Sequence, residues 1–385
     1  MIKNALLVVL LALVPTVALA TPLAHDEFGL FKLKLGGFFY GAAHYDTNNT
    51  AVRPWVNQVL GPTTQGALSF DPYGTRTNLS VETTNSEGPK ANALLEIDWA
   101  PVATPRIRHA YAVVQTGYVD VLLGQYWVPF GTPGPDTYNP MWFSKQGNSY
   151  SRAPQLTLSR GLGPVDVSVT ALAASMISGT IVKGNGAAGT YAYSDGPTPA
   201  GFLRVAYPFA QKKGFVSLTG GAGKLSAAYK TGSATDAARP TANVTTLFGE
   251  LAFSVPVSIL TITGKAFLGS GSGLGTGVGQ TMVIAADDTG SAIPVRGGFL
   301  SVKAKLTDQF VAGVSFGDDD PVNEVSGVVI PIYNNTSFGA EFTWLATTNA
   351  LLALEWEHVA TTNSTASGAA TYPNERFSLV SKFSF

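Results

Sequence analysis

The feature that most constrains this chain is a repeated alternation of apolar and polar residues after position 20. In residues 31–35, for example, lysines at 32 and 34 separate Phe31, Leu33 and Leu35. A strand places successive side chains on opposite faces, whereas a helix would turn them by only about 100°. The alternation therefore predicts an all-β chain whose strands each have an apolar face and a polar face.

Marking every such run predicts sixteen strands. They cover residues 28–45, 66–83, 90–99, 105–116, 118–126, 154–160, 164–175, 200–208, 214–230, 244–254, 257–269, 296–306, 309–317, 336–346, 349–359 and 374–385. Apart from the short 100–104, the connections alternate between long and short, and the long ones include 318–335 and 360–373. An even number of antiparallel strands with tight turns at one end and long loops at the other is typical of outer-membrane barrels.

The composition agrees with a membrane barrel. Only 13% of the 385 residues are charged, against about 25% in a typical soluble domain. The 45% of hydrophobic residues argues against disorder. A net charge of −1 gives no electrostatic reason to expect a nucleic-acid partner, and the absence of cysteine excludes disulfide scaffolds, Cys–zinc sites and thiol nucleophiles.

The first twenty residues are typical of an export signal. Lys3 provides a positive start, residues 5–14 are apolar, and Ala18 and Ala20 suit a signal peptidase. We expect cleavage after Ala20, which leaves 21–385 as the mature barrel. The alternative is a membrane anchor, but the apolar run is short of the roughly 20 residues that a spanning helix needs.

Closure of the sheet explains the alternation physically. In hydrocarbon every backbone N–H and C=O group needs an internal partner, so a sheet can span a bilayer only by closing on itself. One face then meets lipid and the other meets water. A soluble β-sandwich or solenoid is the alternative, but sandwiches carry more Lys and Glu outside, and no repeat is visible. We therefore predict a sixteen-stranded antiparallel transmembrane β-barrel with short periplasmic turns and long outer loops.

Aromatic residues near the predicted strand ends support this barrel, because such rings favour the two headgroup levels of a membrane. These residues are Tyr40, Tyr45, Trp99, Tyr118, Tyr126, Trp127, Tyr207, Phe209, Phe253, Trp344, Trp356 and Tyr372.

Strand parity assigns 13 basic and 8 acidic residues to the polar, inward face. The basic residues are Lys32, Lys34, Arg76, Arg106, Arg108, Arg204, Lys224, Lys230, Lys265, Lys303, Lys305, Arg376 and Lys382. The acidic residues are Glu82, Glu96, Asp98, Asp166, Glu250, Glu341, Glu355 and Glu357. Charges in a lumen set which ions pass. Alternatively, any one of them simply keeps the wall wet.

The residues that we single out as pore-lining candidates are Lys32, Lys34, Arg76, Glu96, Asp98, Arg106, Arg108, Arg204, Lys303, Lys305, Glu355 and Glu357. The longest connection, 127–153, is the candidate constriction loop, with Asp136, Lys145 and Arg152 as its charges.

Signals of catalysis or metal binding are weak. The four histidines have no compact metal-ligand spacing. His109 or His358 beside a Ser or Asn is the only catalytic alternative that we consider, and we predict that the chain is not an enzyme and needs no cofactor. The acidic run 318–320, with Glu324, is either a solvated loop or a divalent-cation site that bridges lipopolysaccharide phosphates.

Two motifs carry a resemblance to a known family. The segment 106–111, Arg-Ile-Arg-His-Ala-Tyr, is followed by Leu-Leu-Gly-Gln-Tyr-Trp at 122–127. Together they resemble general trimeric porins of Gram-negative bacteria, most closely the DcaP-like porins, and the terminal Phe385 resembles the C-terminal signal of such barrels. The resemblance implies a homotrimer in the bacterial outer membrane, in contact with lipid and lipopolysaccharide, and a loop after the fifth strand that folds inward.

Two hypotheses about function follow. The first is a porin, a water-filled channel for passive diffusion of small hydrophilic solutes and ions, with a weak preference for anions because basic residues exceed acidic ones inside. The second is a structural or adhesive barrel whose lumen is blocked. Ion conductance distinguishes the two.

Overall fold

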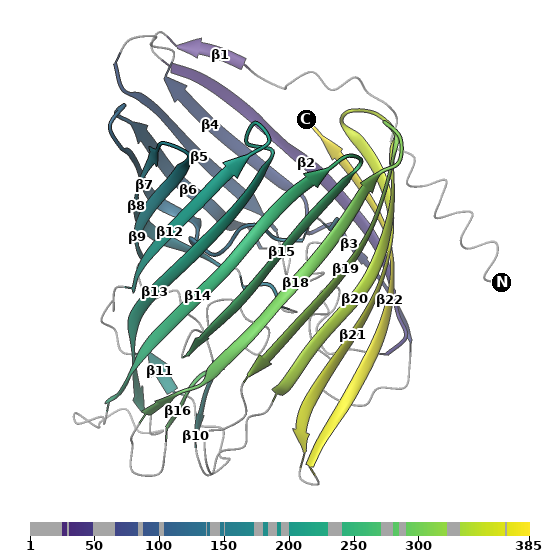
Figure 1. Ribbon diagram of the computed structural model, residues 1–385. Helices are drawn as coiled ribbons and strands as arrows, with labels where there is room; N and C mark the ends of the chain where they lie inside the picture. The colour runs from purple at the N-terminus through teal and green to yellow at the C-terminus, as the bar shows by residue number, and fades with distance from the viewer. Residues whose placement is uncertain are drawn as a thin grey trace, which may run out of the picture.

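The computed structural model shows a closed antiparallel barrel of sixteen strands (Figure 1). It describes residues 25–28, 31–48, 66–83, 88–99, 104–135, 137–138, 147–149, 151–172, 180–183, 191–193, 200–229, 241–270, 280–284, 290–321, 332–365 and 368–385. In this part of the chain, no helix is long and apolar enough to cross a membrane. The predicted fold class is confirmed.

The barrel strands follow one another around the wall in sequence order. They are β2 (Phe31–Asp46), β4 (Arg76–Thr83), β5 (Lys90–Asp98), β6 (Arg106–Gln115), β7 (Asp120–Trp127), β8 (Arg152–Leu162), β9 (Val165–Leu172), β12 (Ala200–Phe209), β13 (Gly214–Tyr229), β14 (Thr241–Val257), β15 (Leu260–Ser270), β18 (Pro294–Lys305), β19 (Phe310–Pro321), β20 (Ile332–Leu345), β21 (Ala350–Thr365) and β22 (Gly368–Ser384).

Closure occurs where β22 pairs with β2, from Phe38 opposite Ser384 to Asp46 opposite Arg376. Beyond the end of the seam where β22 terminates, the short β1 (His25–Phe28) pairs with the first residues of β2. It therefore covers the edge of β2 that β22 leaves open, because β22 ends beside Gly37. Sheet edges are sites of unwanted pairing, and β1 protects this one.

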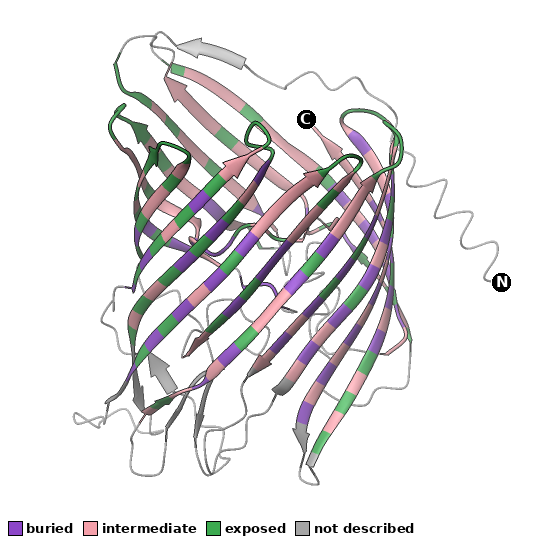
Figure 2. Ribbon diagram, viewed as in Figure 1, coloured by how far each residue is buried: buried purple, intermediate pink, exposed green. Residues whose placement is uncertain are grey.

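Alternation of exposure along the strands divides the wall into two faces, as the repeated green and purple segments of Figure 2 show. Large apolar side chains such as Leu123, Leu218 and Leu268 are exposed by about two-thirds on the outward face. Their neighbours, such as Ser217 and Phe267, are buried on the inward face. An exposed apolar band around a barrel fits a lipid environment.

One predicted strand, 66–83, is two strands in the structure. A turn at residues 72–75 separates β3 (Ala67–Asp71) from β4. Asp71 accepts a hydrogen bond from the Tyr73 amide (2.7 Å), and Thr75 Oγ1 accepts one from the Tyr40 amide (3.1 Å). The turn reverses the parity, so that Phe70 points outward while Arg76 points inward.

The strands continue into two predicted loops, so the predicted bounds of these loops are wrong. β21 and β22 have 16 and 17 residues and are joined by a tight hairpin rather than by a loop over 360–373. β19 and β20 likewise extend into the predicted loop 318–335. At about 3.3 Å per residue these strands exceed the roughly 25 Å apolar band of such barrels. The wall therefore projects beyond the bilayer in this sector.

Four short strands lie within two other predicted loops, 176–199 and 270–295. β11 (Tyr191–Tyr193) pairs with β13 at the loop-bearing rim. β10 (Thr180–Lys183), β16 (Gln280–Ile284) and β17 (Gly290–Ala292) form a separate three-stranded sheet. Alternation in such short segments is too brief to identify a strand from sequence.

Candidate pore and constriction loop

The connection after β7 enters the lumen. Its first described part, residues 128–135, places Phe130 at 0% exposure against the inward face of the barrel. The Phe130 ring lies 4.4 Å from the ring of Phe248 on β14 and 5.2 Å from that of Phe202 on β12, measured between centroids. Val128 joins the same apolar cluster. This apolar cluster holds the loop against the wall.

A buried ion pair fastens the loop at a second level. Lys265 on β15 donates to the backbone oxygens of Phe130 (2.9 Å) and Ser149 (3.0 Å). Ser149 Oγ donates to Glu250 on β14 (2.8 Å), which lies 3.6 Å from Lys265. Both charged side chains are at most 1% exposed. Buried charges are tolerated only when they are paired and hydrogen-bonded, and the two arms of the loop complete this set.

The loop reaches across to the strands near the seam. The Tyr138 amide donates to Glu355 on β21 (2.7 Å), and Lys303 on β18 lies 4.9 Å above the Tyr138 ring. Lys303 also pairs with Glu341 on β20 (2.7 Å). On its return, Gly147 (φ +70°) lies so close to the wall that a Cβ there would be 1.8 Å from the Gly298 oxygen. Only glycine fits this crossing.

The described residues of the loop therefore lie along one side of the lumen, from β12 through β18 to β21, opposite the side formed by β4 to β7. Acidic side chains on the side along which the loop lies are buried: Glu250, Glu341 and Glu355 are at most 6% exposed. Glu357, also predicted to line the pore, is 2% exposed and accepts from Ser337 Oγ (3.2 Å).

The side formed by β4 to β7 carries a cluster of guanidinium groups. Arg106 donates to both oxygens of Asp98 (2.9 Å each). Arg108 donates to Asp98 (2.7 Å) and to Glu96 (2.8 Å). Arg76 on β4 approaches Glu96 at 3.8 Å. The side chains of Arg106 and Arg76 are 39% and 24% exposed, whereas that of Asp98 is 1% exposed. The surface of this cluster is therefore positive.

A β-bulge creates the cluster. Between β5 and β6 the register shifts, because Ile97 lies opposite Ile107 while Glu96 lies opposite His109. Consecutive residues Arg108 and His109 are consequently both buried on the inner side. Bulges re-aim side chains in this way. Gln125 on β7 supports the bulge by donating to the oxygens of Ile107 (2.8 Å) and Arg108 (3.0 Å).

Other predicted pore residues lie toward the tight-turn rim. Lys32 is on the inward face of β2, and Lys34 pairs with Glu82 (2.8 Å) where both side chains are 44% exposed. Arg204 lies inward, above the ring of Phe215 at 5.7 Å. Lys305 donates to Asp308 in the turn (2.7 Å), and this hydrogen bond lowers the pKa of the Asp308 carboxyl.

Of the three predicted loop charges, the structure describes only Arg152. Asp136 and Lys145 lie outside the described residues. Arg152 is the first residue of β8, with its guanidinium 4.8 Å above the Trp127 ring. The alternation along β8 places Arg152 with the exposed Pro154 and Leu156 rather than with the buried Ala153. The expected contribution of Arg152 to the charge of the loop stays a prediction.

The predicted excess of inward basic residues is also wrong. Lys224 shares the outward parity of Leu218, and Lys230 lies outside the described residues. Four acidic residues that parity missed face inward: two lie beyond predicted strand ends, one lies directly before the turn at 72–75, and one lies within a predicted strand. These are Asp46, Asp71, Asp120 and Asp319. For the passage of ions, which inward charges remain exposed to the lumen matters more than the total number of inward charges.

The acidic run 318–320 belongs to β19 and is not a solvated loop. Asp318 accepts from Asn334 Nδ2 (2.7 Å), Asp319 is buried, and Asp320 pairs with Arg296 (2.8 Å). Glu324 lies outside the described residues. Parity failed here because the strand continues beyond the predicted end at 317.

Two of the aromatic residues predicted for the headgroup levels face the lumen instead. Tyr40 is 6% exposed in an inward cluster with Ala42, and Tyr126 shares the inward parity of Ala153. Tyr45, Tyr207 and Trp344 are about half exposed on the outward face, as expected.

Histidines occupy separate surroundings in the described residues. His44 Nδ1 lies 2.8 Å from Ser378 Oγ within the buried seam. His109 packs among the rings of Tyr111, Tyr126 and Trp127. His358 Nδ1 lies 2.6 Å from Glu375 on the outward face. No group of three or more His, Cys, Asp or Glu side chains in the described part of the chain could hold a metal ion.

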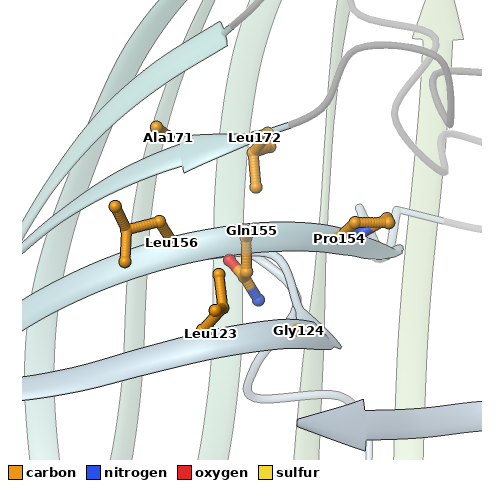
Figure 3. Close-up of a pocket in the computed structure, with 7 residues that line it drawn as sticks. All are labelled: Leu123, Gly124, Pro154, Gln155, Leu156, Ala171 and Leu172. Atoms are coloured by element: carbon orange, nitrogen blue, oxygen red, sulfur yellow. The ribbon is translucent and has the colours of Figure 1, made fainter. Parts of the chain in front are cut away.

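A shallow hollow also lies over β7, β8 and β9 (Figure 3). Leu123, Leu156 and Leu172 contribute to its mainly apolar lining, and Gly124 lies at its edge, where a Cβ would be 2.3 Å from the Ala110 oxygen. Gln155 in this hollow donates to the Trp127 oxygen (2.7 Å). The hollow is a feature of the wall and is separate from the arginine cluster.

Comparison with known proteins identifies the fold. No protein-family model and no curated protein sequence matches the chain. The crystal structure of the outer membrane channel DcaP of Acinetobacter baumannii matches with a TM-score of 0.76 at 19% identity, covering 94% of this chain and 100% of that one. The anion-selective porin from Comamonas acidovorans matches at 0.61 and 12% identity, covering 92% and 100%.

Outer-membrane expressed OmpT of Vibrio cholerae also matches, with a TM-score of 0.60 at 10% identity over 94% of this chain and all of that one. Identities this low show the fold alone. The chain therefore has the outer-membrane porin barrel fold, and the resemblance noted in the sequence is confirmed at that level.

Proposed function

We propose that this chain is a bacterial outer-membrane porin, a water-filled channel for passive diffusion of small hydrophilic solutes and ions. Export would use residues 1–20 as a cleaved signal peptide, and residues 21–385 would form the barrel. The loop 127–153 would form the constriction. The observation that carries the proposal is the path of the described part of this loop along one side of the lumen, opposite a wall with two partly exposed arginines, Arg76 and Arg106.

A weak preference for anions follows from exposure rather than from the total charge. Arg76 and Arg106 stay partly exposed on the side formed by β4 to β7, while Glu250, Glu341 and Glu355 are buried under or beside the loop. A positive wall lowers the free energy of an entering anion and raises that of a cation. The similar Comamonas acidovorans protein is described as anion-selective, which supports the proposal.

Further parts of the proposal concern the surroundings of the barrel. The outward apolar band would contact outer-membrane lipid and lipopolysaccharide. A homotrimer is proposed because one similar structure, OmpT of Vibrio cholerae, is described in a trimer form. No catalytic role, cofactor or nucleic-acid partner is part of this function.

The test is current through purified protein in planar bilayers, with reversal potentials measured in a salt gradient. The expected result is a steady ohmic conductance with a reversal potential displaced toward that of chloride. A strongly cation-selective channel would contradict the assignment of the arginine cluster. An absence of conductance would instead favour the second hypothesis, a structural or adhesive barrel with a blocked lumen.

A further inference from the structure

The hollow over β7, β8 and β9 lies on the outward face of the barrel, away from the lumen. Leu123, Leu156 and Ala171 lie opposite one another on these three strands and line the hollow (Figure 3), and all three are exposed. The volume of the hollow is about 340 Å³, within the range of about 300–1,000 Å³ that is usual for ligand pockets. The hollow is therefore a depression in the apolar band of the barrel.

Backbone forms the floor of this hollow. Gly124, Gln155 and Leu172 lie opposite one another at the next register position. The side chains of Gln155 and Leu172 are at most 5% exposed, so they leave the outer side of the floor unfilled. The exposed Pro154 borders the hollow toward the long connection 127–153. Since the lining is mainly apolar, it suits a hydrocarbon chain and disfavours a hydrated headgroup.

A cation lies beyond the Pro154 border, on the same face. Arg152 precedes Pro154 by two residues on β8, and the alternation along that strand places both side chains outward. The Arg152 guanidinium stacks over the Trp127 ring at 4.8 Å. The donors of a guanidinium lie in its plane, so a stacked arginine still binds an oxygen ligand at its edge. An outward arginine is costly at the middle of a bilayer and is tolerated at the headgroup level.

The spacing between the cation and the hollow fits one lipid that carries both a phosphate and an acyl chain. Leu156 follows Arg152 by four residues on β8, about 13 Å at the usual rise of about 3.3 Å per residue. A guanidinium binds phosphate through charge-assisted hydrogen bonds, and an acyl chain attached close to that phosphate extends from the headgroup level toward the hollow.

The position of Arg152 selects the leaflet. Arg152 begins β8 directly after the long connection 127–153, on the loop-bearing side of the barrel, which faces the outer leaflet. Lipopolysaccharide occupies that leaflet of an outer membrane, whereas phospholipid occupies the inner one. We propose that the hollow and Arg152 together bind lipid A, the acylated and phosphorylated disaccharide of lipopolysaccharide, with a phosphate on Arg152 and an acyl chain in the hollow. The inference rests on the proposed outer-membrane location and gives one of its lipid partners a defined site.

The first test concerns the phosphate. Bisphosphorylated lipid A is added to the detergent-purified barrel, and native mass spectrometry gives the affinity of the one-to-one complex. Arg152→Gln is expected to lower this affinity about tenfold, as for loss of a charge-assisted hydrogen bond, and Arg152→Lys lowers it less because the charge remains. Arg160→Gln is the matched control, because Arg160 is exposed on the same face of β8 beside the tight turn. Equal affinities of wild type and Arg152→Gln overturn the proposal.

The second test concerns the acyl chain. Ala171→Phe fills the hollow and is expected to lower the affinity by at least about fourfold, the effect of excluding a single methylene group. Ala266→Phe is the control, because Ala266 is exposed on β15, away from the hollow, and it leaves the affinity unchanged. Both variants add an apolar ring to the lipid-facing surface, and heat-dependent electrophoretic mobility confirms that each is folded. An unchanged affinity in Ala171→Phe overturns the proposal.

Two further lipids identify the source of the phosphate. Lipid A without phosphate is expected to bind the wild type about as weakly as bisphosphorylated lipid A binds Arg152→Gln. Phosphatidylglycerol is expected to bind more weakly than bisphosphorylated lipid A. Equal affinities of phosphatidylglycerol and lipid A, both lowered by Arg152→Gln, overturn the assignment to lipid A and make the hollow a phospholipid site.

Ion current through the same variants in planar bilayers separates this inference from the channel proposal. Binding of lipid A that depends on Arg152 and Ala171, in a protein without ion current, retains the site and overturns the porin function. A conducting wild type whose affinity for lipid A is unaffected by both substitutions overturns the site and retains the porin function.

Discussion

Arg376 on the last strand forms a two-point ion pair with Asp46 at the end of the first, across 330 residues of chain. Arg376 Nε lies 2.8 Å from Asp46 Oδ1, and Nη2 lies 2.9 Å from Oδ2. Asn374 donates to the same carboxylate (2.8 Å). Both charged side chains are at most 1% exposed. The seam that closes the barrel is thus held by a buried, fully desolvated pair.

Replacing Asp46 with Asn is expected to destabilise the folded barrel by about 3–5 kcal/mol, because the Arg376 guanidinium then stays buried without a counter-charge. The measurement is the temperature at which the folded barrel loses its compact electrophoretic mobility. The control is Asp320→Asn, which breaks the pair with Arg296, whose side chain is 67% exposed; its expected cost is below about 1 kcal/mol. Similar shifts for both variants would refute the role of the seam pair.

Loss of the Lys265 ammonium is expected to release the loop inside the lumen. In Lys265→Met the Phe130 and Ser149 oxygens lose their donor and Glu250 is left as an uncompensated buried charge, so we expect a noisier current with a changed mean conductance. The double variant with Glu250→Gln removes both charges and should recover part of the steady current. Lys305→Met, at the rim, is the control. Unchanged current noise in Lys265→Met would show that the buried pair of Lys265 and Glu250 does not hold the loop.

Replacing both Arg106 and Arg108 with Ala is expected to shift the reversal potential toward cation selectivity. The substitutions also expose Asp98 and Glu96, which adds negative charge to the same wall. Since a fixed charge at about 4 Å in water interacts with an ion by about 1 kcal/mol, each lost arginine accounts for about a fivefold change, and the ratio of anion to cation permeability should fall by about fivefold or more. Arg296→Gln, on the outward face, should leave it unchanged. Unaltered selectivity in the double variant would mean that other groups control the ions.

Deletion of Phe385 is expected to impair assembly. Its backbone exchanges two hydrogen bonds with Gly37 (3.1 and 3.2 Å), and its ring lies 5.2 Å from that of Phe39. The deletion removes the last pair of the seam and the terminal aromatic side chain. The yield of barrel in the outer-membrane fraction measures the effect. Phe385→Trp retains the backbone pair and an aromatic ring, and should assemble normally. Normal yield of the truncated chain would disprove the expectation.

The mature protein is expected to begin at Thr21, because Ala18 and Ala20 have the small side chains that a signal peptidase requires. Intact mass of the protein purified from the outer membrane measures this directly. Retention of residues 1–20 would contradict the assignment of the export signal.

Sequence alternation was sufficient for the fold because it acts over a whole strand. The reversal of faces in runs such as 31–35 and 374–385 needs only neighbouring residues, and a barrel is the form in which such strands satisfy every backbone group in a membrane. Parity also placed Arg76, Arg106 and Arg108 correctly on the inward face. It missed Asp46 and Asp71, because a strand end or a nearby turn changes the parity locally, and it failed for Lys224, which lies within the unbroken strand β13 on its outward face.

Only the tertiary structure decided which inward charges remain exposed. The sequence predicts Glu250, Glu355 and Arg106 as equivalent wall residues, but the folded loop buries the first two and leaves the third accessible. It also decided that Arg376 meets Asp46, and that a bulge turns Arg108 and His109 to the same side. Alternation depends on local backbone geometry, whereas burial, ion pairing and the path of a loop depend on contacts between residues far apart in the chain.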